Sequence, residues 1–199
     1  MTGISEASLR IRVTSAARSG FEWLRRNSFV WSSSLFLAAL AIFVAFQASI
    51  IPGMGLWLDE LFSLWAGDPR TPFPEAFATR ILPDTNGPIY FSLVHLVQQV
   101  GITGRAALIV LNFSLIGVCL ALMLVRGWRS GLMATALSSV AIVLVTAPLL
   151  IYAPEGRVYG PVMALCALIA FEACRTLAGV NVKKNVQRDA GKQKNRQRE

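Results

Sequence analysis

Charged residues are scarce in this chain, and their scarcity excludes most soluble folds. Only 15% of the 199 residues are charged and 54% are hydrophobic, whereas a soluble domain usually has roughly a quarter charged residues. The chain also has only three cysteines and one histidine, without a CxxC pair or a Cys/His cluster. A structural zinc site and a disulfide framework are therefore not expected, and the sequence gives no warrant for a metal or another cofactor.

The charges that are present lie in separate parts of the chain. Residues 1–28 contain five Arg against two Glu, and residues 180–199 contain seven Lys and Arg against two acidic residues. Residues 52–87 are acidic, with five carboxylates against two Arg. Basic ends and an acidic loop, separated by apolar runs, are typical of a membrane topology and not of a nucleic-acid-binding face. We therefore expect membrane lipids as partners and no nucleic acid.

Four apolar runs are long enough to cross a bilayer, which takes about 20 residues of helix. They are residues 29–51, 106–125, 132–152 and 158–178. The first run is too long for the apolar part of a cleaved signal peptide and has no A-x-A cleavage site after it, so it should remain as an anchor. The predicted fold class is all-α, a polytopic transmembrane helical bundle with an amphipathic outer loop after the first span.

A fifth apolar run determines which side of the membrane the connector 126–129 and the basic tail face. Residues 89–100 are short and interrupted by His95, Gln98 and Gln99. If this run crossed the membrane, the basic connector 126–129 and the basic tail would face outward, against the positive-inside tendency. We predict that it is re-entrant or interfacial, and that His95 is a packing residue. The chain is then a multi-pass plasma-membrane protein whose N-terminus and C-terminal tail are cytoplasmic.

The chain divides into three parts on this basis. Prolines and glycines punctuate the outer loop, which holds two short amphipathic pieces. The expected parts are a basic cytoplasmic segment (1–28), a transmembrane domain (29–179) with its outer loop (52–87), and a basic disordered tail (180–199). The tail is expected to be a solvated end, with binding to anionic lipid as the alternative.

Two adjacent carboxylates follow the first span. Asp59 and Glu60 stand beside Trp57, at the start of the amphipathic piece Leu58–Ala66. Desolvation beside the bilayer can raise the pKa of a carboxylate and make it a general base. Alternatively, Asp59 caps a helix that begins at Glu60, while the charge of Glu60 favours the positive end of that helix. The two roles are compatible.

Two further stretches hold polar residues next to apolar runs. Asp84-Thr-Asn-Gly-Pro-Ile-Tyr90 is a turn followed by a helix start. Glu155-Gly-Arg157-Val-Tyr159 lies between two spans, where ionisable residues are costly and indicate function. Arg157 either holds a phosphate through paired donors or pairs with Glu155 and reaches the headgroups. The pattern leaves both alternatives open.

Taken in order, these motifs resemble the membrane-embedded GT-C glycosyltransferases, in particular the branch with protein O-mannosyltransferases and aminoarabinose transferases. The resemblance covers about residues 30–175. The matching residues are Trp57, Asp59, Glu60 and Phe62, then Asp84, Asn86, Pro88 and Tyr90, then Glu155, Arg157 and Tyr159. Gly87 stands where the family usually has a first proline.

The resemblance implies a transferase that takes its sugar from a polyprenyl-phosphate donor at the outer membrane face. Asp59, with Glu60 beside it, matches the family's catalytic acidic motif and would be the general base on an acceptor hydroxyl. The substrate-binding residues would be Asp84, Tyr90, Glu155, Arg157 and Tyr159. Family members are much longer, so the resemblance also predicts that this chain is a truncated product, and it leaves open whether the fragment is active or inactive. The alternative is a non-enzymatic small membrane protein, either a partner subunit or a transporter component.

Overall fold

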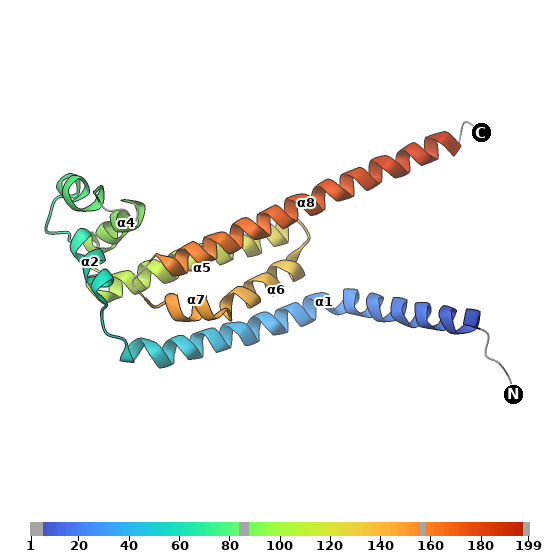
Figure 1. Ribbon diagram of the computed structural model, residues 1–199, viewed down its shortest axis with the longest axis horizontal. Coiled ribbons are helices and arrows are strands. Elements are labelled where there is room, and N and C mark those ends of the chain that lie inside the picture. Colours follow the sequence, from blue (N-terminus) through green and yellow to red (C-terminus); the bar gives the residue numbers. More distant parts are fainter. Residues whose placement is uncertain (1–5, 84–87, 156–157, 197–199) are drawn as a thin grey trace.

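The computed structural model describes residues 6–83, 88–155 and 158–196, and all regular secondary structure within them is helical (Figure 1). Side chains are described from residue 27 to residue 177, apart from the same gaps. The elements are α1 (Glu6–Ile50), η1 (Ile51–Gly53), α2 (Leu58–Ala66), α3 (Phe73–Ala76), η2 (Phe77–Ile81), α4 (Pro88–Gln99), α5 (Arg105–Arg129), α6 (Met133–Leu144), α7 (Ala147–Tyr152) and α8 (Tyr159–Arg196). The predicted all-α fold class is confirmed.

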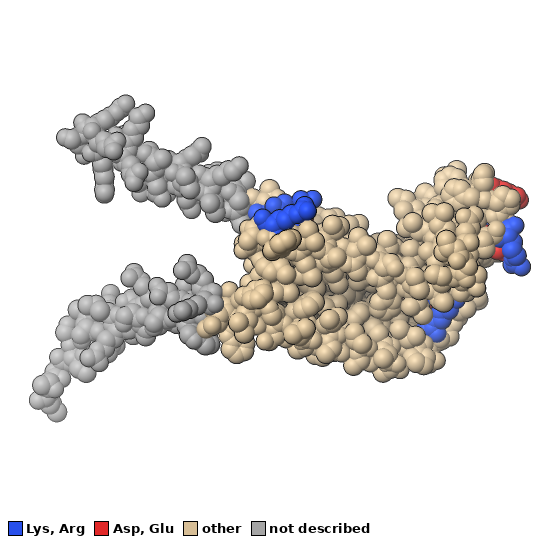
Figure 2. Space-filling model, turned by 180° about the vertical axis from the view of Figure 1, so that it is seen from behind, with Lys and Arg blue, Asp and Glu red and all other residues tan. Residues whose placement is uncertain are grey.

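Three helical stretches are long and apolar enough to cross a membrane: Asn27–Gly53, Arg105–Arg129 and Tyr159–Leu177. Most of their large apolar side chains are not covered by other helices, as Leu37 (62% exposed) and Ile169 (59% exposed) illustrate. Figure 2 shows charged side chains toward the two ends of the described part and an apolar or neutral middle between them. An uncovered apolar belt of this kind is the surface expected of a protein surrounded by lipid.

One face of α1 packs against α6, although about a hundred residues separate the two helices. Ser32, Ala39, Phe43 and Gln47 are the buried residues of this face, and their spacing of seven and four residues keeps them on one side of the helix. The Ser32 and Ser138 hydroxyl groups are hydrogen-bonded at 2.9 Å. Small residues and side-chain hydrogen bonds hold helices together where water does not drive their association.

The prediction of one continuous helix at 132–152 is wrong, because the structure has two helices there. α6 ends at Leu144, and α7 starts at Ala147 after an extended residue, Thr146. Pro148 explains the break: it has no N–H for the carbonyl of residue 144, and its ring collides with a continuing helix. Together, α6 and α7 return the chain from one end of α5 to the other (Figure 1).

The outer loop folds into a small helical lobe beside the long helices. α2 has the bounds that the sequence predicts, and the second amphipathic piece forms α3 and a π-helical turn, η2. α4 has 12 residues, hence a length of about 18 Å, against roughly 30 Å for the apolar core of a bilayer. α4 is therefore too short to span a membrane.

The lobe lies at one end of the bundle, and the connector between α5 and α6 lies at the opposite end (Figure 1). The middle parts of α1 and α8 lie at the connector end as well. α8 continues as a helix to Arg196, so the predicted disordered tail at 180–199 is helical over most of its length. The Lys, Arg and Gln residues of this segment are good helix formers, which accounts for the difference.

Candidate functional site

Described residues of all three sequence motifs lie at the lobe end of the bundle, around a second apolar core. This core joins α2, η2, α4 and the first turns of α5, and it is separate from the core that joins α1, α5, α6, α7 and α8. Its buried members are Ala66, Ile81, Tyr90, Phe91, Val94, Leu108 and Leu111. Because it fixes α2 and α4 against α5, it also fixes the polar side chains that these helices carry.

Glu60 is the inward-facing carboxylate of the first motif. Its side chain is 1% exposed, and its Oε2 atom accepts a hydrogen bond of 2.9 Å from the backbone N–H of Trp57. α2 begins at Leu58 and not at Glu60, where the capping alternative placed its start, so Glu60 is its third residue and can reach back to the residue before the helix. The prediction that Asp59 caps this helix is therefore wrong, because Glu60 makes the capping bond.

Asp59 lies on the exposed side of α2. Its backbone carbonyl accepts a 2.8 Å hydrogen bond from the Ser63 hydroxyl group, one turn further along the helix. Its carboxylate stands in the first turn, where the helix dipole stabilises a negative charge. Asp59 therefore lies where a substrate can reach it, and the bond from Trp57 to Glu60 fixes the backbone that carries it.

Tyr90 connects the second motif to the first. It is 6% exposed, and its hydroxyl group donates a 3.0 Å hydrogen bond to Oδ1 of Asn112. Burial and the negative charge of the nearby Glu60 carboxylate raise the pKa of Tyr90 well above its ordinary value, more than the bond to Asn112 lowers it. Tyr90 is therefore a neutral hydrogen-bond donor at physiological pH.

Asn112 connects the second motif to the third. It is completely buried in α5, and its Nδ2 group donates a hydrogen bond to the backbone carbonyl of Glu155. Tyr90, Asn112 and Glu155 thus form one hydrogen-bonded chain across α4, α5 and the segment before α8, and the Glu60 carboxylate on α2 lies near enough to Tyr90 to raise its pKa. Sequence reasoning missed Asn112, although a lone amide in an apolar span is costly and indicates a specific role.

Of the predicted site residues that the structure describes, Tyr159 stands apart from this chain of interactions. Tyr159 is 49% exposed, and its ring packs edge to face against Tyr152, with 5.7 Å between ring centroids. The Glu155 side chain is half-buried. Asp84 and Arg157 lie outside the described residues, so the structure does not place either of them.

Arg105, the first residue of α5, is a cation that sequence reasoning missed. Its Nη1 group donates a hydrogen bond to the Met54 carbonyl in the linker between α1 and α2. Its Nε and Nη2 groups are covered and have no hydrogen-bond partner in the part of the chain that the structure describes. A guanidinium with unused donors in a covered place favours an anionic partner. Its position directly before the apolar run was the clue in the sequence.

His95 and Gln98 have packing roles. His95 is 0% exposed, lies 5.2 Å from the Phe73 ring and is within 2.9 Å of the Gln99 amide. Gln98 donates a 2.8 Å hydrogen bond to the Gly67 carbonyl, at the end of α2. These contacts hold α4 against α2 and α3, and they agree with the prediction that His95 is a packing residue.

Among the described residues, no group of three His, Cys, Asp or Glu side chains could hold a metal ion. The candidate site is therefore defined by the Asp59 carboxylate, the buried Glu60, the chain from Tyr90 to Glu155, and the Arg105 guanidinium.

No protein-family model matches this chain, and no curated protein or solved structure matches it either.

Proposed function

We propose that this chain is a glycosyltransferase-like membrane protein of the GT-C type. It transfers a sugar from a polyprenyl-phosphate donor to an acceptor hydroxyl at the outer face of the plasma membrane, with its N-terminus and the end of α8 in the cytoplasm. The observation that supports the proposal is the convergence of its three motifs at one end of the bundle. The hydrogen bonds of Asn112 to Tyr90 and to Glu155 link motifs that are far apart in the sequence.

Asp59 is the general base in this proposal. Its carboxylate takes the proton of the acceptor hydroxyl group while the acceptor oxygen attacks the anomeric carbon of the donor sugar. The bond between that carbon and the phosphate oxygen breaks, and its electron pair leaves with the lipid phosphate, so the configuration at the anomeric carbon is inverted. The exposed position of Asp59 on α2 suits a group that must touch a substrate.

The leaving phosphate gains negative charge, so a cation must lie beside it. Arg105 has the chemistry for this role, because two of its donor groups are unused among the described residues. Arg157, which the resemblance places in the third motif, is the other candidate. In this proposal Asp84, Tyr90, Glu155 and Tyr159 contribute to binding the donor or to the shape of its site.

Replacing Asp59 with Asn tests the proposed chemistry. Membranes that contain the chain are supplied with radiolabelled polyprenyl-phosphate mannose or aminoarabinose, and labelled acceptor is counted. We expect Asp59→Asn to reduce the rate by about a hundredfold or more, which is the typical contribution of a general base. Glu75→Gln is the matched control, because Glu75 is an exposed carboxylate of the same lobe, and its rate should stay unchanged.

The alternative function is that of a non-enzymatic small membrane protein. One observation favours it: the Glu60 carboxylate and the Tyr90 hydroxyl group are both engaged in bonds within the protein, as purely structural side chains are. The same assay separates the two functions. If the unsubstituted chain transfers neither sugar, the enzymatic proposal fails for this chain and the non-enzymatic function stands.

A further inference from the structure

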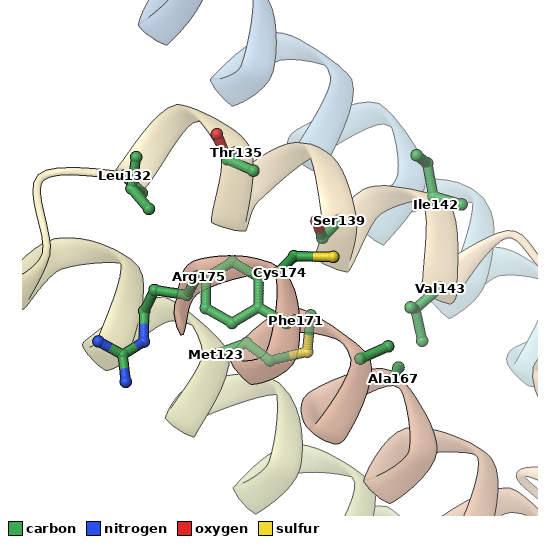
Figure 3. Close-up of a pocket in the computed structure, with 11 residues that line it drawn as sticks. Met123, Leu132, Thr135, Ser139, Ile142, Val143, Ala167, Phe171, Cys174 and Arg175 are labelled. Carbon is green, nitrogen blue, oxygen red and sulfur yellow. The ribbon is translucent and has the colours of Figure 1, made fainter. Parts of the chain in front are cut away.

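A groove opens between α6 and α8 at the end of the bundle far from the candidate site. Its volume is about 580 Å3, and Figure 3 shows its lining side chains on three helices. α5 contributes Met123, α6 and the residue before it contribute Leu132, Thr135, Ser139, Ile142 and Val143, and α8 contributes Ala167, Ala170, Phe171, Cys174 and Arg175. The groove is independent of the proposed transferase activity, which uses none of these residues.

The floor and walls of the groove are apolar. Met123 (1% exposed) and Phe171 (6% exposed) close its floor, while Ala167 and Ala170 leave space on the α8 side because their side chains are small. The groove lies between helices whose outer faces suit lipid, so an apolar chain fills it more favourably than water does. These features fit a single hydrocarbon chain.

The end of the groove carries net positive charge. Arg175 lines the groove and donates hydrogen bonds of 2.8 Å and 2.6 Å from Nε and Nη2 to Glu172. Arg126 lies 3.6 Å from the other oxygen of the same carboxylate. Two guanidinium groups thus share one carboxylate, and Arg129 adds a further positive charge one helical turn after Arg126. On the face that Figure 2 shows, basic side chains without acidic ones gather at this end.

We propose that this groove binds an anionic phospholipid. One acyl chain lies between α6 and α8, and the phosphate group accepts hydrogen bonds from Arg175 and Arg126. Charge complementarity selects the headgroup, because the cluster has one more positive than negative charge before Arg129 is counted. Basic pockets between transmembrane helices are known binding sites for anionic headgroups on the cytoplasmic side, which is the side that the positive-inside tendency assigns to this end.

Thermal unfolding of the purified full chain in detergent tests the proposal. Dioleoyl phosphatidylglycerol and dioleoyl phosphatidylcholine are added separately, so that only the headgroup differs. We expect phosphatidylglycerol to raise Tm by about 3 °C more than phosphatidylcholine at a tenfold excess over its Kd. Equal shifts from the two lipids would overturn the assignment of the headgroup.

Two variants separate the two parts of the site. Arg175→Gln should weaken phosphatidylglycerol binding at least fivefold. Arg70→Gln in the distant lobe is the control, because it also removes an exposed guanidinium that is paired with a carboxylate. It should leave phosphatidylglycerol binding unchanged. Ala170→Phe should weaken the binding of both lipids by filling the groove, and this exposed position tolerates a larger side chain. Unchanged lipid binding in Ala170→Phe would overturn the proposal even if Arg175→Gln did not fold.

Discussion

At the scale of single residues, the amide of Asn112 has a hydrogen bond on each side. It accepts one from Tyr90 and donates one to the carbonyl oxygen of Glu155. All three groups lie where water is largely excluded, so each bond avoids the cost of an unpaired buried polar group. The amide therefore fixes α4 and the segment before α8 in relation to α5, and with them two of the three motifs.

Replacing Asn112 with Leu should destabilise the protein. Leu has a similar size but leaves the Tyr90 hydroxyl group and the Glu155 carbonyl without this partner, which costs about 1–3 kcal/mol of unfolding free energy. Denaturant titration in micelles measures the loss. Ser114→Leu, two residues further along α5 at an exposed position, is the control and should change stability by less than about 0.5 kcal/mol. Equal effects of the two variants would contradict the role of Asn112.

Tyr90 should ionise only at a pH well above the ordinary value for a tyrosine. Its folded-state pKa is raised by burial and by the charge of Glu60, so its contribution to stability is fully present below the unfolded value of about 10 and is lost as the pH rises through the folded-state pKa. The chain has three tyrosines, and near-ultraviolet absorbance follows their phenolate forms. Tyr90→Phe should remove phenolate absorbance that appears well above pH 10, and loss of absorbance near or below the ordinary value of about 10 instead would contradict the assignment.

The sequence identified some of these residues and missed others for a physical reason. Glu60, Tyr90 and Glu155 stand in polar stretches next to apolar runs, where single residues are conspicuous. Asn112 is one amide inside a run that is otherwise apolar, and Arg105 directly precedes that run. Their importance depends on which residues lie opposite them in space, and periodicity within one helix carries no such information.

At the scale of elements, local patterns predicted the helices that form from their own residues. α2 combines an amphipathic pattern with acidic residues in its first turn, and the predicted piece Leu58–Ala66 has the observed bounds. The run 132–152 is uniformly apolar, so hydropathy alone predicted one span. The effect of Pro148 on the backbone was decisive there, because it ends α6 before α7 begins.

Gly127 allows α5 and α6 to come close together. A Cβ atom at this position would collide with Cβ of Ala136 and lie 3.3 Å from the carbonyl oxygen of Leu132. We expect Gly127→Ala to lower the unfolding free energy by about 1–3 kcal/mol, as overpacking does. Gly117→Ala on the same helix is the control, because nothing lies within 4 Å of its Cβ position, and it should be neutral or slightly stabilising.

At the scale of the whole molecule, the described part has two ends of different character. The helical lobe α2–α4 lies at one end, and the basic connector between α5 and α6 lies at the other. Four passages of the chain run between the ends if α6 and α7 are counted together. If each passage crosses the membrane, an even number of passages places the start of α1 and the end of α8 on the same side of it, as the distribution of Arg residues also predicts.

Labelling from outside intact cells tests this arrangement. In a background in which the three cysteines are replaced by Ala, Glu75→Cys in the lobe should react with a membrane-impermeant maleimide. Arg129→Cys in the connector should react only after the membrane is permeabilised. Both positions are exposed in the structure, so covering by other helices does not account for a difference. Reaction of both positions from the same side would contradict the proposed topology.

The hydrogen bond between α1 and α7 has a consequence for biosynthesis. Gln47 Nε2 donates to the carbonyl oxygen of Leu150, with 2.9 Å between the atoms. The amide of Gln47 enters the bilayer with the first helix, long before the ribosome has made residue 150. Until then it must find another partner, such as water, a lipid headgroup or an insertion factor. The nascent first helix is thus less stable in lipid than its hydropathy suggests. It gains its final stability when α6 and α7 are made and Gln47 can bond to Leu150.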